Sequence, residues 1–353
     1  MPDARTTSAP ATMLEQRPAP GRARAGWSPL VWPALALLLL FAWNGIFTEG
    51  FFSITTRGGN LYGPIIDIFD RAAPLAIVAL GMTLVIATGG IDLSVGAVVA
   101  ISGSVAATLM IADPARGFDM PMPAAVALAL LVCCACGAIS GMLVSLLGVQ
   151  PIVATLILMV AGRGIAQGVG QNVPIDPANP FGKFGNDHFA FLPFAITMAL
   201  AVLLATLALT RGTALGLFIR SVGNNPLASR LAGVQVRTVT FAVYVFSGLC
   251  AGIAGLIVAS EIRLADANKA GLYLELDAIL AVVVGGTALT GGRFYLVGSA
   301  LGALLIQTLT ITIYRSNIEW QYALVIKAAV VLVVCLLQSP EFRRRFVLRR
   351  AAA

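Results

Sequence analysis

The stretch 81–103 most constrains the fold, because it places a carboxylate between two apolar runs. The runs are broken at Thr88-Gly89-Gly90, and Asp92 and Ser94 follow the break. Hydrocarbon offers a charged side chain no water, so such a residue usually faces a cavity or a protein partner. Glycine lets the backbone bend, and irregular backbone at membrane depth survives only where protein or water shelters it. The stretch therefore predicts a pathway across a membrane rather than a passive anchor.

The composition places the chain among polytopic membrane proteins. Of its 353 residues, 58% are hydrophobic and only 11% are charged, whereas soluble domains carry roughly a quarter charged residues. A spanning helix needs about 20 mostly apolar residues. We therefore expect an all-α fold with about ten transmembrane helices. These are expected over residues 30–47, 65–87, 93–111, 124–147, 152–169, 191–209, 239–259, 274–284, 295–313 and 322–337.

The basic residues predict the orientation in the membrane. The net charge is +7, and with ten helices and both termini inside, about twice as many Lys and Arg lie inside as outside, as the positive-inside rule requires. We expect a disordered basic cytoplasmic tail over 1–28, a membrane domain over 29–338 and a basic cytoplasmic tail over 339–353. An odd number of helices would place one basic tail outside. Aromatic residues are not interleaved with the basic ones, so we expect no nucleic-acid partner.

No pattern of a metal, cofactor or catalytic site is found in the sequence. The cysteines lie inside apolar runs, where they are expected to act as small buried hydrophobic residues. Their spacing does not match a zinc site, and the single histidine, His188, lies in a polar loop. The chain has no nucleophile–base pairing and no G-x-x-x-x-G-K-S/T run, so we expect neither an enzyme nor a nucleotide site. The five cysteines are Cys133, Cys134, Cys136, Cys250 and Cys335.

A second glycine-rich break, over 285–292, has the same layout as the first. In both, an apolar run leads into a glycine pair, a short polar turn and a helix rich in small residues. Transporters often arise from internal repeats, with the pathway near the broken helices. The alternative is that the small residues only allow helices to pack closely. The glycines of the two breaks are Gly89, Gly90, Gly285, Gly286, Gly291 and Gly292.

The connection 211–237 is basic and contains no acidic residue. Its Gly223-Asn224-Asn225-Pro226 turn predicts the start of a short helix over 227–232. This segment is either held at anionic lipid headgroups or forms a docking element for a partner, as a helix in a groove. The residues expected to contribute are Arg220, Asn224, Asn225, Pro226, Ala228, Ser229 and Arg230, and the small side chains among them suit close docking.

Several polar side chains fall within or at the ends of the apolar runs, and these are candidates for a transport path. For each, a structural role is the alternative. Arg163, flanked by two glycines, could form an ion pair with Asp92 or Asp277, or extend to the interface. The candidates are Thr88, Asp92, Ser94, Gln150, Thr155, Arg163, Gln167, Asn268, Glu275 and Asp277.

The run GMTLVIATGGIDLSVGAV resembles the signature of permease subunits of bacterial ABC-type sugar importers, in the ribose/xylose/arabinose group. The likeness extends over about Asn60–Gln338. Within the group the chain looks most like the galactofuranose permeases, on the runs DIFDRAAPLAIVALGMTLVIATGGIDLSVGA, VATLILMVAGRGIAQ and ADANKAGLYLELDAILAVVVGG.

This resemblance implies a permease in the bacterial inner membrane that forms the path for a monosaccharide. The sugar would be galactofuranose or, alternatively, ribose, xylose or arabinose. A periplasmic binding protein would deliver it, a second permease chain of the same or another kind would complete the channel, and a separate ATPase would bind 211–237 as a coupling element. ATP would be used only by that ATPase. An ion-coupled secondary transporter is the other transport class, but it would leave the basic connection unexplained.

Overall fold

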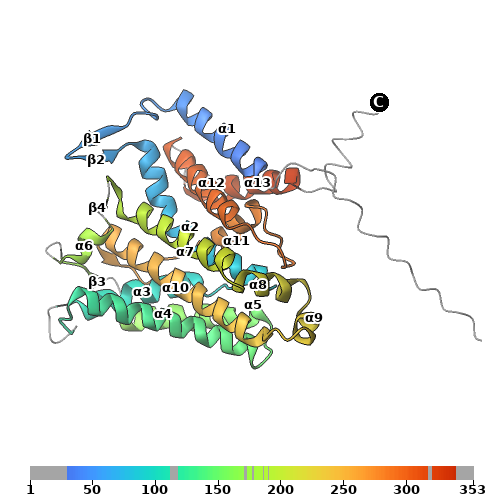
Figure 1. The fold of residues 1–353 in the computed structure, drawn as a ribbon. Helices are drawn as coiled ribbons and strands as arrows, with labels where there is room; N and C mark the ends of the chain where they lie inside the picture. Colours follow the sequence, from blue (N-terminus) through green and yellow to red (C-terminus); the bar gives the residue numbers. More distant parts are fainter. Residues whose placement is uncertain are drawn as a thin grey trace, which may run out of the picture.

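The computed structural model describes residues 30–111, 118–170, 173–176, 179–185, 187–189, 191–316 and 320–338. The two tails expected over 1–28 and 339–353 lie outside these residues, as does the side chain of Cys335. The described chain is mostly helical, which confirms the expected fold class (Figure 1). Which of its ends faces the cytoplasm stays a prediction.

A helix occupies each of the ten expected positions, with ends that differ by a few residues. Six of them, α2, α4, α5, α7, α10 and α12, are long and apolar enough to cross a membrane. The ten are α1 (Val31–Phe47), α2 (Pro64–Ala87), α3 (Val95–Leu109), α4 (Met122–Ser145), α5 (Pro151–Val169), α7 (Phe194–Gly212), α10 (Val236–Ile262), α11 (Leu274–Val284), α12 (Leu296–Arg315) and α13 (Trp320–Gln338).

The two ends of the helix assembly differ. One carries three short antiparallel strand pairs and α6 (Phe181–Phe184), and the opposite end carries α8 (Leu215–Asn224) and α9 (Pro226–Leu231) (Figure 1). The expected short helix corresponds to α9, but α8 was not predicted. The strand pairs are β1 (Thr55–Arg57) with β2 (Asn60–Tyr62), β3 (Val173–Pro174) with β6 (Leu264–Ala265), and β4 (His188–Phe189) with β5 (Leu192–Pro193).

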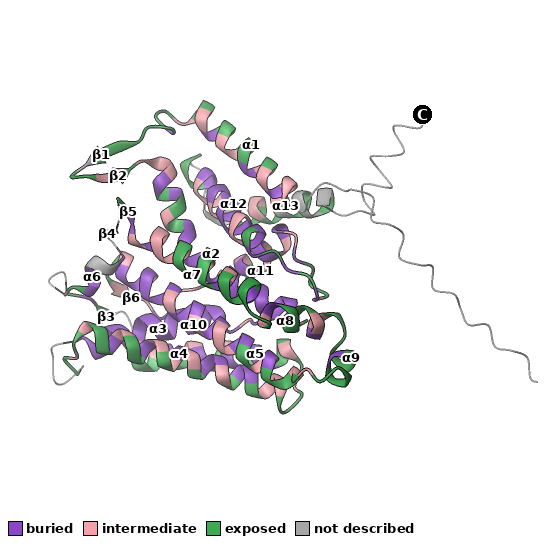
Figure 2. Cartoon of the chain, in the orientation of Figure 1, coloured by how far each residue is buried: buried purple, intermediate pink, exposed green. Residues whose placement is uncertain are grey.

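Helices α2, α10 and α12 form the buried centre, whereas α4, α5 and α7 are largely exposed (Figure 2). Small residues bring α10 close to its neighbour α4, as is common between membrane helices. A Cβ added to Gly248 of α10 would lie 3.0 Å from the Cα of Gly137 of α4. Cys133 of α4 packs beside Gly252 of α10. Cys133, Cys136 and Cys250 are buried free thiols, which confirms their expected packing role, whereas Cys134 is only half-buried.

Helices α3 and α11 are too short to cross the membrane alone. At 1.5 Å per residue, the 15 residues of α3 and the 11 of α11 extend about 22 and about 16 Å, against a hydrocarbon core of about 30 Å. Irregular segments adjoin both helices: 88–94 precedes α3, 266–273 precedes α11 and 285–295 follows it. Non-helical backbone is therefore placed inside the protein, where polar side chains can face it.

Candidate functional site

Asp92, the most informative residue of the sequence, lies in the protein core, with only 1% of its surface exposed. Its Oδ1 accepts hydrogen bonds from the backbone N–H and the Oγ of Ser94, at 3.0 and 2.5 Å. Its Oδ2 accepts one from Ser247 Oγ of α10 at 2.8 Å. The carboxylate therefore fastens the first glycine break to α10. Ser247 was not among the residues predicted from the sequence, where it is recognisable only as a small polar residue in a long apolar run.

The threonines near the first break bind backbone of their own helices. Thr88 Oγ1 donates to the Val85 carbonyl at 2.8 Å, and Thr155 Oγ1 donates to the Pro151 carbonyl at 2.9 Å. Tyr244 of α10, which the sequence analysis did not single out, lies against Gly90: a Cβ there would be 2.6 Å from its hydroxyl. The Thr155 and Tyr244 hydroxyls also each lie 3.4 Å from the Ile91 carbonyl, so both side chains reach the backbone of the break.

The second break lies directly beside the first. The N–H of Gly292 donates to the Ala87 carbonyl at the end of α2, at 2.9 Å. Gly291 and Gly292 have φ values of +82° and +84°, a left-handed conformation that glycine adopts without strain. The two breaks are thus joined by their backbones, although about 200 residues separate them in the sequence. Gly285, at the start of this break, packs against the backbone of Gly298 of α12.

A cavity of about 480 Å³ opens beside the first break, at the end of the protein that carries α9. It lies between the break, the α4–α5 connection, α9 and the start of α10. Its wall combines backbone, four hydroxyl-bearing side chains, two arginines and several apolar side chains, which suits a ligand rich in hydroxyl groups. The residues that set this character are Thr88, Gly90, Gly148, Arg230, Arg237 and Tyr244.

Arg163 of α5 holds the irregular segment that precedes α11. Its Nη1 donates to the carbonyls of Ala270 at 2.5 Å and Ala267 at 3.3 Å. Gln167, one turn on, donates to the Asn268 side chain at 2.7 Å. The ion pair considered between Arg163 and Asp92 or Asp277 is wrong, because both carboxylates have other partners and Arg163 binds carbonyls. Gln150 is exposed at the start of α5.

Glu275, in the first turn of α11, is 5% exposed. Its Oε2 has no hydrogen-bond partner among the described residues. The oxygen lies against Gly96 of α3, where a Cβ would overlap it. The partial positive charge of a helix N-terminus favours an acidic residue at this place. Glu275 therefore sits where the short helices α3 and α11 meet.

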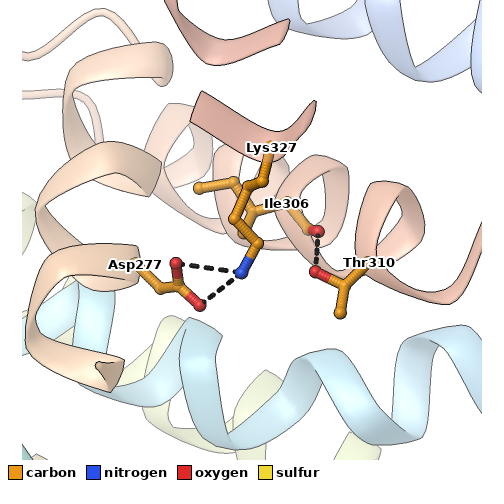
Figure 3. Close-up of polar contacts among 4 residues, drawn as sticks. All are labelled: Asp277, Ile306, Thr310 and Lys327. Atoms are coloured by element: carbon orange, nitrogen blue, oxygen red, sulfur yellow. Dashed lines mark hydrogen bonds and ion pairs between the residues drawn. The ribbon is translucent and has the colours of Figure 1, made fainter. Parts of the chain in front are cut away.

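The carboxylate of Asp277 forms an ion pair with a lysine of α13 and does not line the cavity. Lys327 Nζ of α13 lies 2.8 Å from its Oδ2 and 3.1 Å from its Oδ1 (Figure 3). In the same view Thr310 Oγ1 of α12 donates to the Ile306 carbonyl at 2.8 Å, so that hydroxyl is engaged by its own helix. The ion pair joins α11 to the last helix, and it gives Asp277 a structural partner.

The α8–α9 segment presents both polar and apolar side chains. Asn225 caps α9, because its Oδ1 accepts the N–H of Ala228 at 3.0 Å. Ser229 is 3% exposed and its Oγ lies 2.7 Å from Ser221 Oγ, so it holds α9 to α8 and cannot contact a partner as expected. The exposed residues of this segment include Arg220, Asn224, Pro226, Leu227, Ala228, Arg230 and Leu231.

Comparisons with known proteins agree with this architecture. Residues 65–335 match the family described as branched-chain amino acid transport system / permease component. The chain is 48% identical to the galactofuranose transporter permease protein YtfT of Escherichia coli K12, over 88% of this chain and 91% of the relative. It is 38% identical to the fructose import permease protein FruF of Bifidobacterium longum, over 89% and 88%.

It is also 36% identical to the ribose import permease protein RbsC of Escherichia coli K12, over 87% of this chain and 92% of the relative. No solved structure matches the chain. The family match covers the helices from α2 to α13, including both glycine breaks and the α8–α9 segment. The chain therefore belongs to this family of transport-system permease components.

Proposed function

We propose that the chain is the permease subunit of an ABC-type sugar importer in the bacterial inner membrane, with galactofuranose as its substrate. The observation that carries this proposal is the 48% identity to a galactofuranose permease over nearly the whole length of both chains. Relatives that import fructose and ribose are less similar, at 38% and 36% identity. The hydroxyl-compatible cavity beside the glycine break supports a sugar as the transported molecule.

The sugar path runs along α5 and is completed by a second permease chain. Val160, with 70% of its surface exposed, and Ile157, with 58%, lie on the same helix as the half-exposed Arg163 and Gln167. Polar side chains at membrane depth normally face protein or a water-filled cavity rather than lipid. The other faces of the protein contact membrane lipid.

The α8–α9 segment docks on a separate ATPase, as a helix seated in a groove. Leu227 and Leu231, one turn apart on α9, are 67% and 84% exposed, and Arg230 lies between them. Apolar side chains so exposed at the end of a membrane protein favour a protein partner. ATP is hydrolysed on that partner, because this sequence has no phosphate-binding run. The termini then lie in the cytoplasm, and a periplasmic binding protein delivers the sugar at the end that carries the strands.

Uptake of labelled sugars into proteoliposomes tests the proposal. The vesicles contain this chain with the ATPase and binding protein encoded next to it and any second permease. Galactofuranose is compared with ribose, fructose, xylose and arabinose. Uptake that needs both ATP and the binding protein is expected, with galactofuranose preferred. Uptake driven by a proton or sodium gradient without ATP would show a secondary transporter instead.

The variant Leu231→Asp checks the docking surface, with copurification of the ATPase as the measurement. An aspartate in an apolar groove would lose its water, so we expect the ATPase to copurify at least tenfold less well. Ile54→Asp is the matched control, since Ile54 is 57% exposed next to β1, at the opposite end of the protein. Equal copurification of the two variants would contradict docking at α9.

A further inference from the structure

Three segments that are far apart in the sequence meet by their backbones alone at the end of α8. Gly223, the residue before the last in α8, lies against the Ala87 carbonyl of the first break and the Gly292 N–H of the second. A Cβ at Gly223 would overlap the Ala87 oxygen and would lie 2.5 Å from the Gly292 nitrogen. The Gly292 N–H itself donates to the Ala87 carbonyl at 2.9 Å. We call this three-way contact the glycine junction.

The glycine junction leaves little room for adjustment. A Cβ on Gly291 would lie 3.0 Å from the Gly89 nitrogen and 3.2 Å from the Gly223 oxygen, and one on Gly292 would overlap Asn224 Oδ1. Side chains can change rotamer to absorb a small shift, but packed backbone cannot. Tightly packed contacts therefore change between discrete arrangements rather than deform gradually. A displacement of α8 must move both breaks or separate from them.

Helix α8 is in turn tied to the exposed helix α9. The Ser221–Ser229 contact of 2.7 Å joins the two helices, and the N–H of Ser229 donates to the Asn225 carbonyl at 3.0 Å. One turn before the junction, the Arg220 guanidinium lies over the Phe294 ring, 5.1 Å from its centre. A continuous set of contacts thus runs from the exposed face of α9 through α8 to both breaks.

We propose that the glycine junction transmits the movement of α8 to both glycine breaks, which makes Gly223 and Gly292 positioning residues for ATP-driven transport. This rests on the proposed docking of an ATPase at α8–α9. Neither glycine needs to touch the sugar. A force applied at α9 reaches Ala87, five residues before the anchored Asp92, and at the same time reaches the second break. The breaks therefore change conformation together.

The substitution Gly292→Ala tests the proposal, because its methyl group would strike Asn224 Oδ1. We expect the variant to reach the membrane, bind the ATPase and hydrolyse ATP, but to move at least tenfold less sugar per ATP. Gly59→Ala is the matched control, since Gly59 has the same φ of +84° but nothing lies within 4 Å of a Cβ there, in the β1–β2 turn at the opposite end of the protein. In Gly292→Ala/Asn224→Ala the obstructing oxygen is gone and only the strain of the φ of +84° remains, as in Gly59→Ala, so we expect much of the sugar moved per ATP to return, relative to Asn224→Ala alone.

The outcomes separate this proposal from the proposed function. Wild-type uptake without ATP would overturn both. ATP-dependent wild-type uptake with a Gly292→Ala variant within twofold of Gly59→Ala would overturn the glycine junction alone. A Gly292→Ala variant that fails to accumulate or to bind the ATPase, and that the second substitution does not rescue, would show a purely structural glycine and would also overturn it.

Discussion

Removing one member of the Asp277–Lys327 ion pair should destabilise the protein, and removing both should restore most of the loss. The pair joins α11 to α13 through two contacts, at 2.8 and 3.1 Å (Figure 3). The side chain of Lys327 is 13% exposed and that of Asp277 22%. Lys327→Met leaves an unpaired carboxylate among apolar helices, whereas Asp277→Leu/Lys327→Met leaves two apolar side chains in contact.

The expected size follows from this burial. Breaking one partner of a buried pair costs about 3–5 kcal/mol, while replacing both partners by apolar residues is often neutral. Because both side chains keep some exposure, the lower end applies, about 3 kcal/mol for either single variant. At about 2 °C per kcal/mol for a chain of this size, the melting temperature should fall by about 6 °C. The double variant should recover at least half of that.

Thermal melting of the detergent-solubilised protein, followed by the fraction that remains monodisperse after heating, measures this effect. Lys269→Met is the matched control, because Lys269 is exposed in the segment before α11 and should melt like the wild type. A double-mutant cycle then isolates the pair from the single substitutions. Single variants that lower the melting temperature by less than 2 °C, or effects that simply add in the double variant, would refute the reasoning.

Three further outcomes follow from the buried contacts. Ser247→Ala leaves Asp92 Oδ2 without its donor and should cost about 2 kcal/mol in the same melt; an unchanged melting temperature would contradict the anchoring role. Gly96→Ala should sharply lower membrane abundance, because its methyl group overlaps Glu275 Oε2, whereas Gly164→Ala, with open space around it, should not. Arg163→Gln should reduce sugar uptake at least tenfold with the ATPase still bound, since it frees the carbonyls before α11; unaltered uptake per molecule would exclude α5 from the path.

Local patterns in the sequence were enough to place the helices. The expected 152–169 and 274–284 compare with Pro151–Val169 and Leu274–Val284 in the structure. Apolar length and glycine or proline punctuation are properties of neighbouring residues, so a single sequence carries them. Helix α8 was missed because it is an amphipathic helix of 10 residues rather than an apolar run long enough to span the membrane. Packing against α2, α7 and α10 stabilises it instead, and the two-residue strands carry too little pattern to be recognised.

Patterns of neighbouring residues identify the membrane class, the two glycine breaks and the turn that starts α9, because each depends on residues adjacent in the chain. The groups that these elements contact follow instead from the packing of distant segments. Asp277 and Lys327 are 50 residues apart, and Asp92 and Ser247 are 155 apart. The glycine junction joins α2, α8 and the second break by backbone contacts that no side-chain pattern records. A buried polar residue requires a hydrogen-bond partner, but the packing of the helices determines which distant residue becomes that partner.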